Sequence, residues 1–302
     1  MKEISGVIGY LVTPFLEDEV NEGVLREMVN DLISSGVHGL APLGSTGESA
    51  YLDDGEWESV ARITVQECRG RVPVIVGASA LTTRKAVRLA QKAKAIGADA
   101  VMVLPISYWN LSEDEIFGHY SAISQAADIP IMVYNNPATS GVDMSPELMV
   151  KMIREIEQPF AIKESSGDIQ RMHRIFELSN GCVPFFNGSN PLAFEALCAG
   201  ASGWCTAAPN LIAESNLLLW DCVQEGRFEE ARNAFYQQLP LLRFILKGGL
   251  PATIKSGLLL RGIDAGSPRL PLLPLGQAGV DELQQLLRAH TCGGSAFGQS
   301  VM

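Results

Sequence analysis

The strongest constraint on the fold is a repeated alternation of short apolar runs with amphipathic stretches. Each run is mostly aliphatic, and in the stretch that follows, apolar residues recur every three or four positions, as on one face of a helix. The predicted strands are Val7–Val12, Gly39–Leu43, Val72–Val76, Ala100–Leu104, Ile129–Tyr134, Phe160–Lys163, Val183–Phe186 and Gly203–Thr206. Such alternation indicates parallel strands joined by right-handed helical crossovers.

The intervening helices carry recognisable start and stop signals. Ser112 with Glu115 forms a capping box, and Ser145-Pro146 places a proline at the first helical position. The other predicted helices are Val24–Ser35, Trp57–Cys68, Thr83–Ile96, Ile169–Leu178, Leu192–Leu197 and Asn210–Glu225. Eight such units predict a TIM (β/α)8 barrel over residues 1–225. A doubly wound open sheet is the alternative, although no GxGxxG follows the first strand.

Beyond the barrel, three further helical segments are predicted at about 226–246, 250–262 and 279–290, with a stiff connector containing Pro268, Pro271 and Pro274. We therefore expect a C-terminal helical subdomain over residues 226–290 that packs on the barrel. Residues 291–302 are small and polar, and they predict a mobile tail.

The amino-acid composition restricts the kinds of binding partner and the cellular compartment that we expect. The net charge of −11 argues against nucleic acid or an anionic membrane as a partner, because both require clustered lysine and arginine. No long uncharged apolar window and no signal-like start occurs. The six cysteines lack CxxC spacing, and most lie in apolar contexts typical of buried free thiols. We expect a cytoplasmic protein without a membrane span.

The sixth apolar run ends in a lysine, Lys163. Lysine is rarely fully buried, and burial favours its neutral amine, which is a nucleophile suited to Schiff-base formation with a carbonyl substrate. The alternative is a structural lysine whose amine reaches solvent at the strand end.

Other strand ends carry hydroxyl groups, and barrel active sites lie at this end of the strands. Gly44-Ser45-Thr46-Gly47-Glu48 is either a tight turn or a nest of N–H groups and hydroxyls for a carboxylate. Tyr134 is either a core residue or a neighbour of Lys163, about 5 Å away across adjacent strands. The four histidines lack metal-ligand spacing, so we expect no metal site.

Three motifs in order resemble the dihydrodipicolinate synthase/N-acetylneuraminate lyase family of class I, Schiff-base aldolases. They are Gly44–Glu48, Tyr134-Asn135-Asn136-Pro137 and Lys163–Asp168. The resemblance extends over roughly residues 4 to 290. It implies an imine between Lys163 and a 2-oxo acid, typically pyruvate, without a cofactor.

The resemblance also implies roles for other residues. Tyr134, relayed by Thr46, moves protons, and Tyr108 reaches into the site of a neighbouring subunit of a homotetramer built as a dimer of dimers. Glu164 is expected to be structural, because it faces away from Lys163. The implied substrate-binding residues are Ser45, Thr46, Thr139, Gly188, Ser189, Cys205 and Thr206.

Two departures from the family pattern bear on the substrate. Synthases that make the lysine precursor carry an arginine where this chain has Thr139. The positions at which ligands for feedback lysine are expected hold Asp54, Trp57, Leu81 and Lys85. The sequence therefore favours a Schiff-base lyase or aldolase acting on pyruvate or a related 2-oxo acid or sugar acid. The alternatives are a 4-hydroxy-tetrahydrodipicolinate synthase and a non-catalytic barrel that binds a small ligand.

Overall fold

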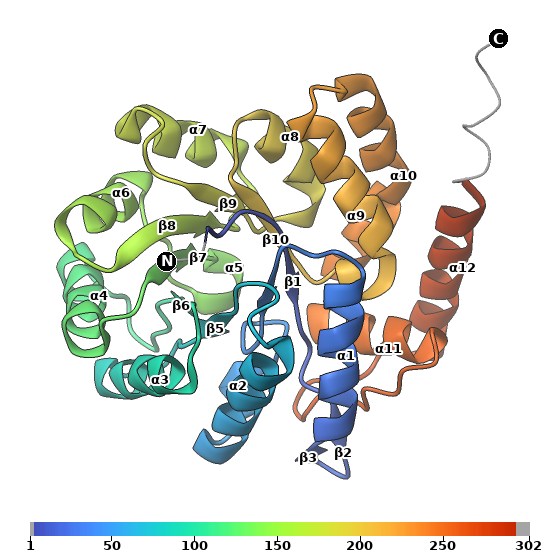
Figure 1. The fold of residues 1–302 in the computed structure, drawn as a ribbon, viewed down its shortest axis with the longest axis horizontal. Coiled ribbons are helices and arrows are strands. Elements are labelled where there is room, and N and C mark those ends of the chain that lie inside the picture. The colour runs from blue at the N-terminus through green and yellow to red at the C-terminus, as the bar shows by residue number, and fades with distance from the viewer. Residues whose placement is uncertain (1–2, 294–302) are drawn as a thin grey trace.

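The computed structural model describes residues 3–293 and shows eight parallel strands curled into a barrel (Figure 1). The order around the sheet is β4-β1-β10-β9-β8-β7-β6-β5, and a parallel bridge between Leu40 and Val74 joins its two ends. The strands are β1 (Gly6–Tyr10), β4 (Gly39–Ala41), β5 (Ile75–Gly77), β6 (Ala100–Val103), β7 (Ile131–Asn135), β8 (Pro159–Glu164), β9 (Phe185–Asn187) and β10 (Gly203–Thr206). The predicted TIM barrel is confirmed, and the open-sheet alternative is wrong.

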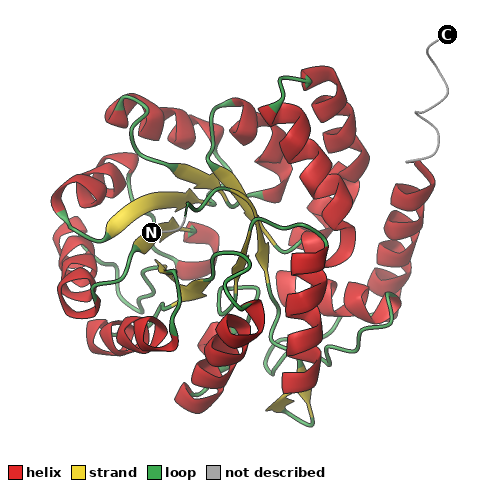
Figure 2. Ribbon diagram, in the orientation of Figure 1, coloured by secondary structure: helices red, strands yellow, loops and turns green. Residues whose placement is uncertain are grey.

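Helices surround the strands on the outside (Figure 2). Asn21, Asp53, Thr82, Ser112 and Ser145 each cap a helix by accepting a backbone N–H, and the predicted capping box at Ser112 is present. The helices of the barrel are α1 (Glu22–Ser34), α2 (Asp54–Cys68), α3 (Thr83–Ile96), α4 (Glu113–Ala127), α6 (Pro146–Glu155), α7 (Ile169–Ser179), α8 (Ala193–Cys198) and α9 (Pro209–Gln224).

Several strands are shorter than the apolar runs that predicted them. β1 stops at Tyr10 and β4 at Ala41, although Leu11, Val12 and Leu43 beyond them are buried. The loops at the carboxyl ends of these strands are packed into the barrel mouth, so their residues are as apolar as those of the strands. The sequence analysis also missed a small hairpin, β2 (Phe15–Leu16) with β3 (Glu19–Val20), and the short helix α5 (Pro137–Ser140).

A close backbone contact fixes one of these loops. A Cβ atom at Gly77 would lie 1.9 Å from the carbonyl oxygen of Leu43, so only glycine fits at the end of β5. The loop after β4 therefore rests directly on β5. This loop carries the Gly44–Glu48 motif.

Three helices follow the barrel on one side of it: the first two pack against α9, and the third packs against the first two (Figure 1). They are α10 (Phe228–Lys247), α11 (Leu250–Leu260) and α12 (Gln277–Gly293). α12 continues past the predicted end at residue 290, and residues 294–302 of the predicted tail lie outside the described residues. No helix in the described part is long and apolar enough to cross a bilayer.

Candidate active site

Lys163 and Tyr134 lie side by side at the barrel mouth. They are register partners on the parallel strands β8 and β7, and the Lys163 Nζ atom lies 3.7 Å from the centre of the Tyr134 ring. Lys163 is only 4% exposed. The amine therefore points into the barrel, and the alternative in which it reaches solvent is wrong.

The surroundings of the amine are aromatic and apolar. The Lys163 Nζ atom also lies 4.2 Å from the centre of the Tyr10 ring and 4.0 Å from the Met102 Sδ atom. Within residues 3–293, no carboxylate lies within ion-pair distance of it. Glu164, the next residue, faces the other way and pairs with Arg171 at 3.1 Å, which agrees with its expected structural role.

The Tyr134 phenol has several hydrogen-bond partners. Asn136 Nδ2 donates to the phenol oxygen at 2.8 Å, and the side chains of Lys163 and Ser45 lie near enough to act on its pKa. Burial raises the pKa of Tyr134, but the positive charge of Lys163, the Asn136 hydrogen bond and the nearby Ser45 hydroxyl outweigh burial and lower it below the ordinary value. A phenol of this kind is suited to proton transfer. The hydroxyl that lowers the pKa of this phenol is that of Ser45, whereas the next residue of the loop, Thr46, is buried.

The Gly44–Glu48 loop is both a tight turn and a wall of the site. Gly47 N donates to the Gly44 carbonyl, and Thr13 Oγ1 donates to the Gly47 carbonyl at 2.7 Å. Ser45 lines the same cavity as Tyr134. The structure is therefore compatible with both interpretations of this motif, a tight turn and a binding loop for a carboxylate.

Glu48 ends this loop in a left-handed conformation and forms a buried ion pair. Its Oε1 atom lies 2.7 Å from Lys255 Nζ on α11, and its Oε2 atom accepts the backbone N–H of Arg269 at 2.7 Å. Burial lowers the pKa of Lys255, although Glu48 opposes this shift. The C-terminal helices are thus tied to the loop that borders the site.

The loops after β9 and β10 form the opposite side of the site. A Cβ atom at Gly188 would lie 2.7 Å from Lys163 Cε, so the absence of a side chain there makes room for the lysine. The Ser189 amide donates to Asn187 Oδ1 at 3.0 Å, which orders the loop. Thr206 Oγ1 donates to Asn190 Oδ1 at 2.7 Å.

Cys205 is the next residue of this wall. Burial raises the pKa of its thiol, and the charge of Lys163 opposes that shift. Gly188 therefore adjoins the lysine and Cys205 lies within range of its charge, whereas the Thr206 hydroxyl donates to Asn190 within the wall.

A cavity of about 330 Å³ is lined by Tyr134 and Met102, the two residues that contact the Lys163 amine, although Lys163 itself does not line it. It contains three predicted residues, Ser45, Tyr134 and Thr139. The other lining residues are Leu43, Gly44, Glu48, Ser49, Ala50, Tyr51, Ser79, Met102, Leu104, Ile106, Leu250, Pro251 and Leu272. Tyr108 is 91% exposed and does not line the cavity of its own chain.

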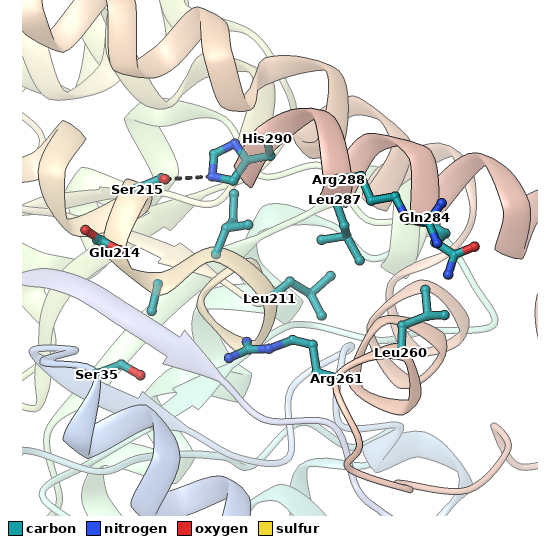
Figure 3. Close-up of a pocket in the computed structure, with 12 residues that line it drawn as sticks. Ser35, Leu211, Glu214, Ser215, Leu260, Arg261, Gln284, Leu287, Arg288 and His290 are labelled. Carbon is teal, nitrogen blue, oxygen red and sulfur yellow. Dashed lines mark hydrogen bonds between the residues drawn. The ribbon is translucent and has the colours of Figure 1, made fainter. Parts of the chain in front are cut away.

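A larger cavity, of about 580 Å³, lies outside the barrel between α1, α9, α11 and α12 (Figure 3). His290 and Ser215 face each other at its upper edge, 2.7 Å apart. Tyr134 and Ser45, which line the smaller cavity, do not line it. Cavity size alone therefore does not identify the active site. The reactive side chains, Lys163 and Tyr134, lie at the barrel mouth.

Within the described residues, no cluster of histidine, cysteine, aspartate and glutamate side chains could hold a metal ion. His38 instead accepts the Val7 amide at 3.0 Å, which is a structural use of its ring. The site is built from an amine, phenols and hydroxyls.

Sequence reasoning missed Tyr10, Met102 and Asn136. Tyr10 and Met102 belong to apolar runs in which aromatic and thioether side chains are ordinary core residues. Asn136 belongs to the Tyr134-Asn135-Asn136-Pro137 motif, and its position two residues after Tyr134 is the sequence signal that could have identified it as a partner of the phenol.

Comparison with known proteins agrees with this geometry. The model of the dihydrodipicolinate synthetase family matches residues 3–290. The chain belongs to this family. Its members are class I aldolase-type lyases, so the predicted enzyme class and the predicted family are confirmed.

Curated relatives and solved structures extend over nearly the same length. A 4-hydroxy-tetrahydrodipicolinate synthase of Methanopyrus kandleri is 35% identical over 95% of this chain and 95% of its own. A crystal structure from Pseudomonas aeruginosa, provisionally named a dihydrodipicolinate synthetase, is 53% identical with a TM-score of 0.94, over 95% of this chain and 99% of its own. Dihydrodipicolinate synthase from Aquifex aeolicus is 28% identical with a TM-score of 0.92, over 95% and 98% of the two chains. The protein is a Schiff-base lyase similar to dihydrodipicolinate synthase.

Proposed function

We propose that Lys163 forms an imine with the C2 carbonyl of pyruvate or of a related 2-oxo acid or sugar acid. The observation that carries this proposal is the buried Lys163 amine, which has no carboxylate partner in the described residues and lies 3.7 Å from the ring of a phenol whose pKa is lowered.

The proposed chemistry follows from this arrangement. The unprotonated amine attacks C2, the carbonyl oxygen takes up protons through Tyr134 and leaves as water, and a protonated imine remains on Lys163. This imine withdraws electrons from C3, so a bond from C3 to its neighbour breaks or forms through an enamine. Ser45, Thr46 and the backbone N–H groups of their loop hold the substrate carboxylate.

The residues that line the cavity limit the charge and the chemical type of the second substrate. Among the described residues that line it there is no arginine or lysine, and its one carboxylate, Glu48, is paired with Lys255. Thr139 stands where a guanidinium would hold a second carboxylate in two hydrogen bonds. The mixture of aliphatic and hydroxyl groups favours an uncharged aldehyde or a hydroxylated chain. A 4-hydroxy-tetrahydrodipicolinate synthase is the second candidate, favoured by the names of the curated relatives.

We also propose that lysine does not regulate this enzyme. Asp54, Trp57, Leu81 and Lys85 line one cavity of about 400 Å³, in which Lys85 Nζ lies 3.0 Å from Asp54 Oδ1. Addition of lysine is therefore expected to leave the activity unchanged.

The assembly and the compartment are further parts of this proposal. The exposed Tyr108 ring packs edge-on against Trp109 on a loop outside its own cavity, which suits a role in the site of a neighbouring subunit of a homotetramer. Light scattering tests the tetramer, and loss of turnover in Tyr108→Phe tests the shared site. The free thiols Cys68, Cys205 and Cys222 fit a reducing, cytoplasmic location.

A substrate panel tests the proposed function. Purified enzyme is incubated with pyruvate and neutral aldehydes, with sugar acids alone, and with pyruvate and aspartate semialdehyde, and product formation is followed by mass spectrometry. We expect turnover in the first two sets to exceed that in the third. Efficient turnover in the third set and in neither of the other two would show that the second candidate is correct.

A further inference from the structure

We infer that Tyr10 is an additional active-site residue, and that the face of its ring holds the positively charged nitrogen of the Lys163 imine opposite Tyr134. This inference rests on the proposed function and deepens it, because it assigns an electrostatic role in the same site to a residue of the first strand.

The orientation of Tyr10 presents its ring to the amine. Tyr10 lies at the end of β1, is 3% exposed, and its ring centre lies 4.2 Å from Lys163 Nζ. Its hydroxyl donates to Met102 Sδ at 2.8 Å. Since the hydroxyl is engaged with Met102, the ring face is the part of Tyr10 that lies against the nitrogen.

The ring is fixed from two further directions. The Tyr10 carbonyl accepts a hydrogen bond from Asn210 Nδ2 at 2.8 Å, which anchors its backbone. Gly44 lies against the ring, and a Cβ atom there would be 3.1 Å from Tyr10 Cε1. Gly44 opens the loop proposed to hold the substrate carboxylate, so one ring supports both that loop and the reacting nitrogen.

The charge of the imine explains why a second ring is useful. The nitrogen becomes positive when the imine forms, and within residues 3–293 no carboxylate pairs with it. Two ring faces, at 3.7 Å and 4.2 Å, take the place of a counter-ion. A ring face attracts a cation, and more strongly when water is excluded.

The two tyrosines have different roles in this proposal. The pKa of Tyr134 is lowered, as proton transfer requires, whereas burial raises the pKa of Tyr10 well above its ordinary value. Tyr10 therefore stays protonated during turnover. Its contribution is the electron density of its ring and its rigid position.

The test compares Tyr10→Phe with Tyr10→Leu. Each variant is titrated with pyruvate, the imine is trapped with borohydride, and the trapped fraction from intact mass gives the equilibrium constant for imine formation. Phe keeps the ring, so we expect a change of less than about threefold, whereas Leu is expected to weaken imine formation about tenfold. Phe235→Leu, which removes a buried ring from α10, is the matched control and should leave the constant unchanged.

A second measurement separates ring charge from packing. Fluorinated phenylalanines at position 10 keep the shape of the ring while withdrawing its electrons, so they retain the fold if Tyr10→Leu does not. We expect imine formation to weaken with each added fluorine. A constant that does not change along this series overturns the inference about Tyr10. If the wild-type enzyme forms no adduct with any 2-oxo acid, the proposed function fails, and the inference fails with it.

Discussion

The buried ion pair between Lys255 and Glu48 offers a quantitative test of how the C-terminal helices support the site. The two side chains are 2% and 0% exposed, and the charged atoms are 2.7 Å apart. Lys255→Met removes the ammonium and leaves the Glu48 carboxylate buried, with the backbone N–H of Arg269 as its remaining polar contact among those described. Breaking a buried pair in this way costs about 3–5 kcal/mol.

The expected change in melting temperature follows from the length of the chain. An unfolding entropy of about 2.1 cal/mol/K per residue over 302 residues is about 0.63 kcal/mol/K, so the Tm falls by about 5–8 °C. Because Glu48 ends the loop that we propose holds the substrate carboxylate, KM for the 2-oxo acid is expected to rise by more than kcat falls. Calorimetry and steady-state kinetics measure the two effects.

Two comparisons sharpen this prediction. Lys85→Met breaks a pair of similar length with Asp54, but its side chains are 42% and 49% exposed, so it should cost less than about 1 kcal/mol. The double variant Lys255→Met/Glu48→Gln removes both buried charges and should be more stable than Lys255→Met alone. A loss in Lys255→Met no larger than in Lys85→Met, or a double variant that is less stable than the single one, would refute this reasoning.

Three further predictions follow from the same geometry. Asn136→Leu removes a hydrogen bond to the Tyr134 phenol, so the pKa of Tyr134 should rise and the matching limb of the pH–rate profile should move to higher pH. Thr139→Arg supplies a guanidinium at the cavity, and it should raise kcat/KM for an aldehyde that carries a carboxylate by about tenfold or more. Burial lowers the pKa of His38, so the folded state favours the neutral ring, and its contribution to stability is lost as the pH falls below about 6.5; the Tm should fall toward pH 5, less so in His38→Gln.

Each of these predictions has an outcome that contradicts it. An unchanged pH profile in Asn136→Leu means that the amide does not tune the phenol. A Thr139→Arg enzyme with no preference for the charged aldehyde shows that a missing guanidinium does not set the specificity. An equal Tm shift with pH in wild type and His38→Gln assigns the acid effect to other groups.

The central pair of the site could be predicted from the sequence because the fold determines it. Lys163 and Tyr134 lie one residue before the ends of consecutive strands, and consecutive parallel strands in a barrel are neighbours, so the sequence predicts that the two residues lie side by side. The Gly44–Glu48 loop was recognisable for a similar reason, since it follows a strand and contains two glycines. Local sequence patterns were therefore sufficient to predict the functional residues that lie at or just after the end of a strand.

The remaining parts depend on contacts that no local pattern encodes. Tyr10 and Met102 lie in apolar runs, where nothing in the sequence separates a residue that touches the amine from one that fills the core. Leu250 and Leu272 line the cavity because the C-terminal segments return to the barrel mouth, and that return is a matter of tertiary packing. The ends of β1 and β4 were overestimated because the buried loops that follow them are as apolar as the strands.

Borohydride trapping with peptide mapping tests the central claim most directly. Enzyme treated with pyruvate or another 2-oxo acid and then reduced should carry one adduct, located on Lys163, and Lys163→Met should carry none. Adduct on a different lysine, or no adduct with any 2-oxo acid while the enzyme remains folded, contradicts the assignment of Lys163 as the Schiff-base residue.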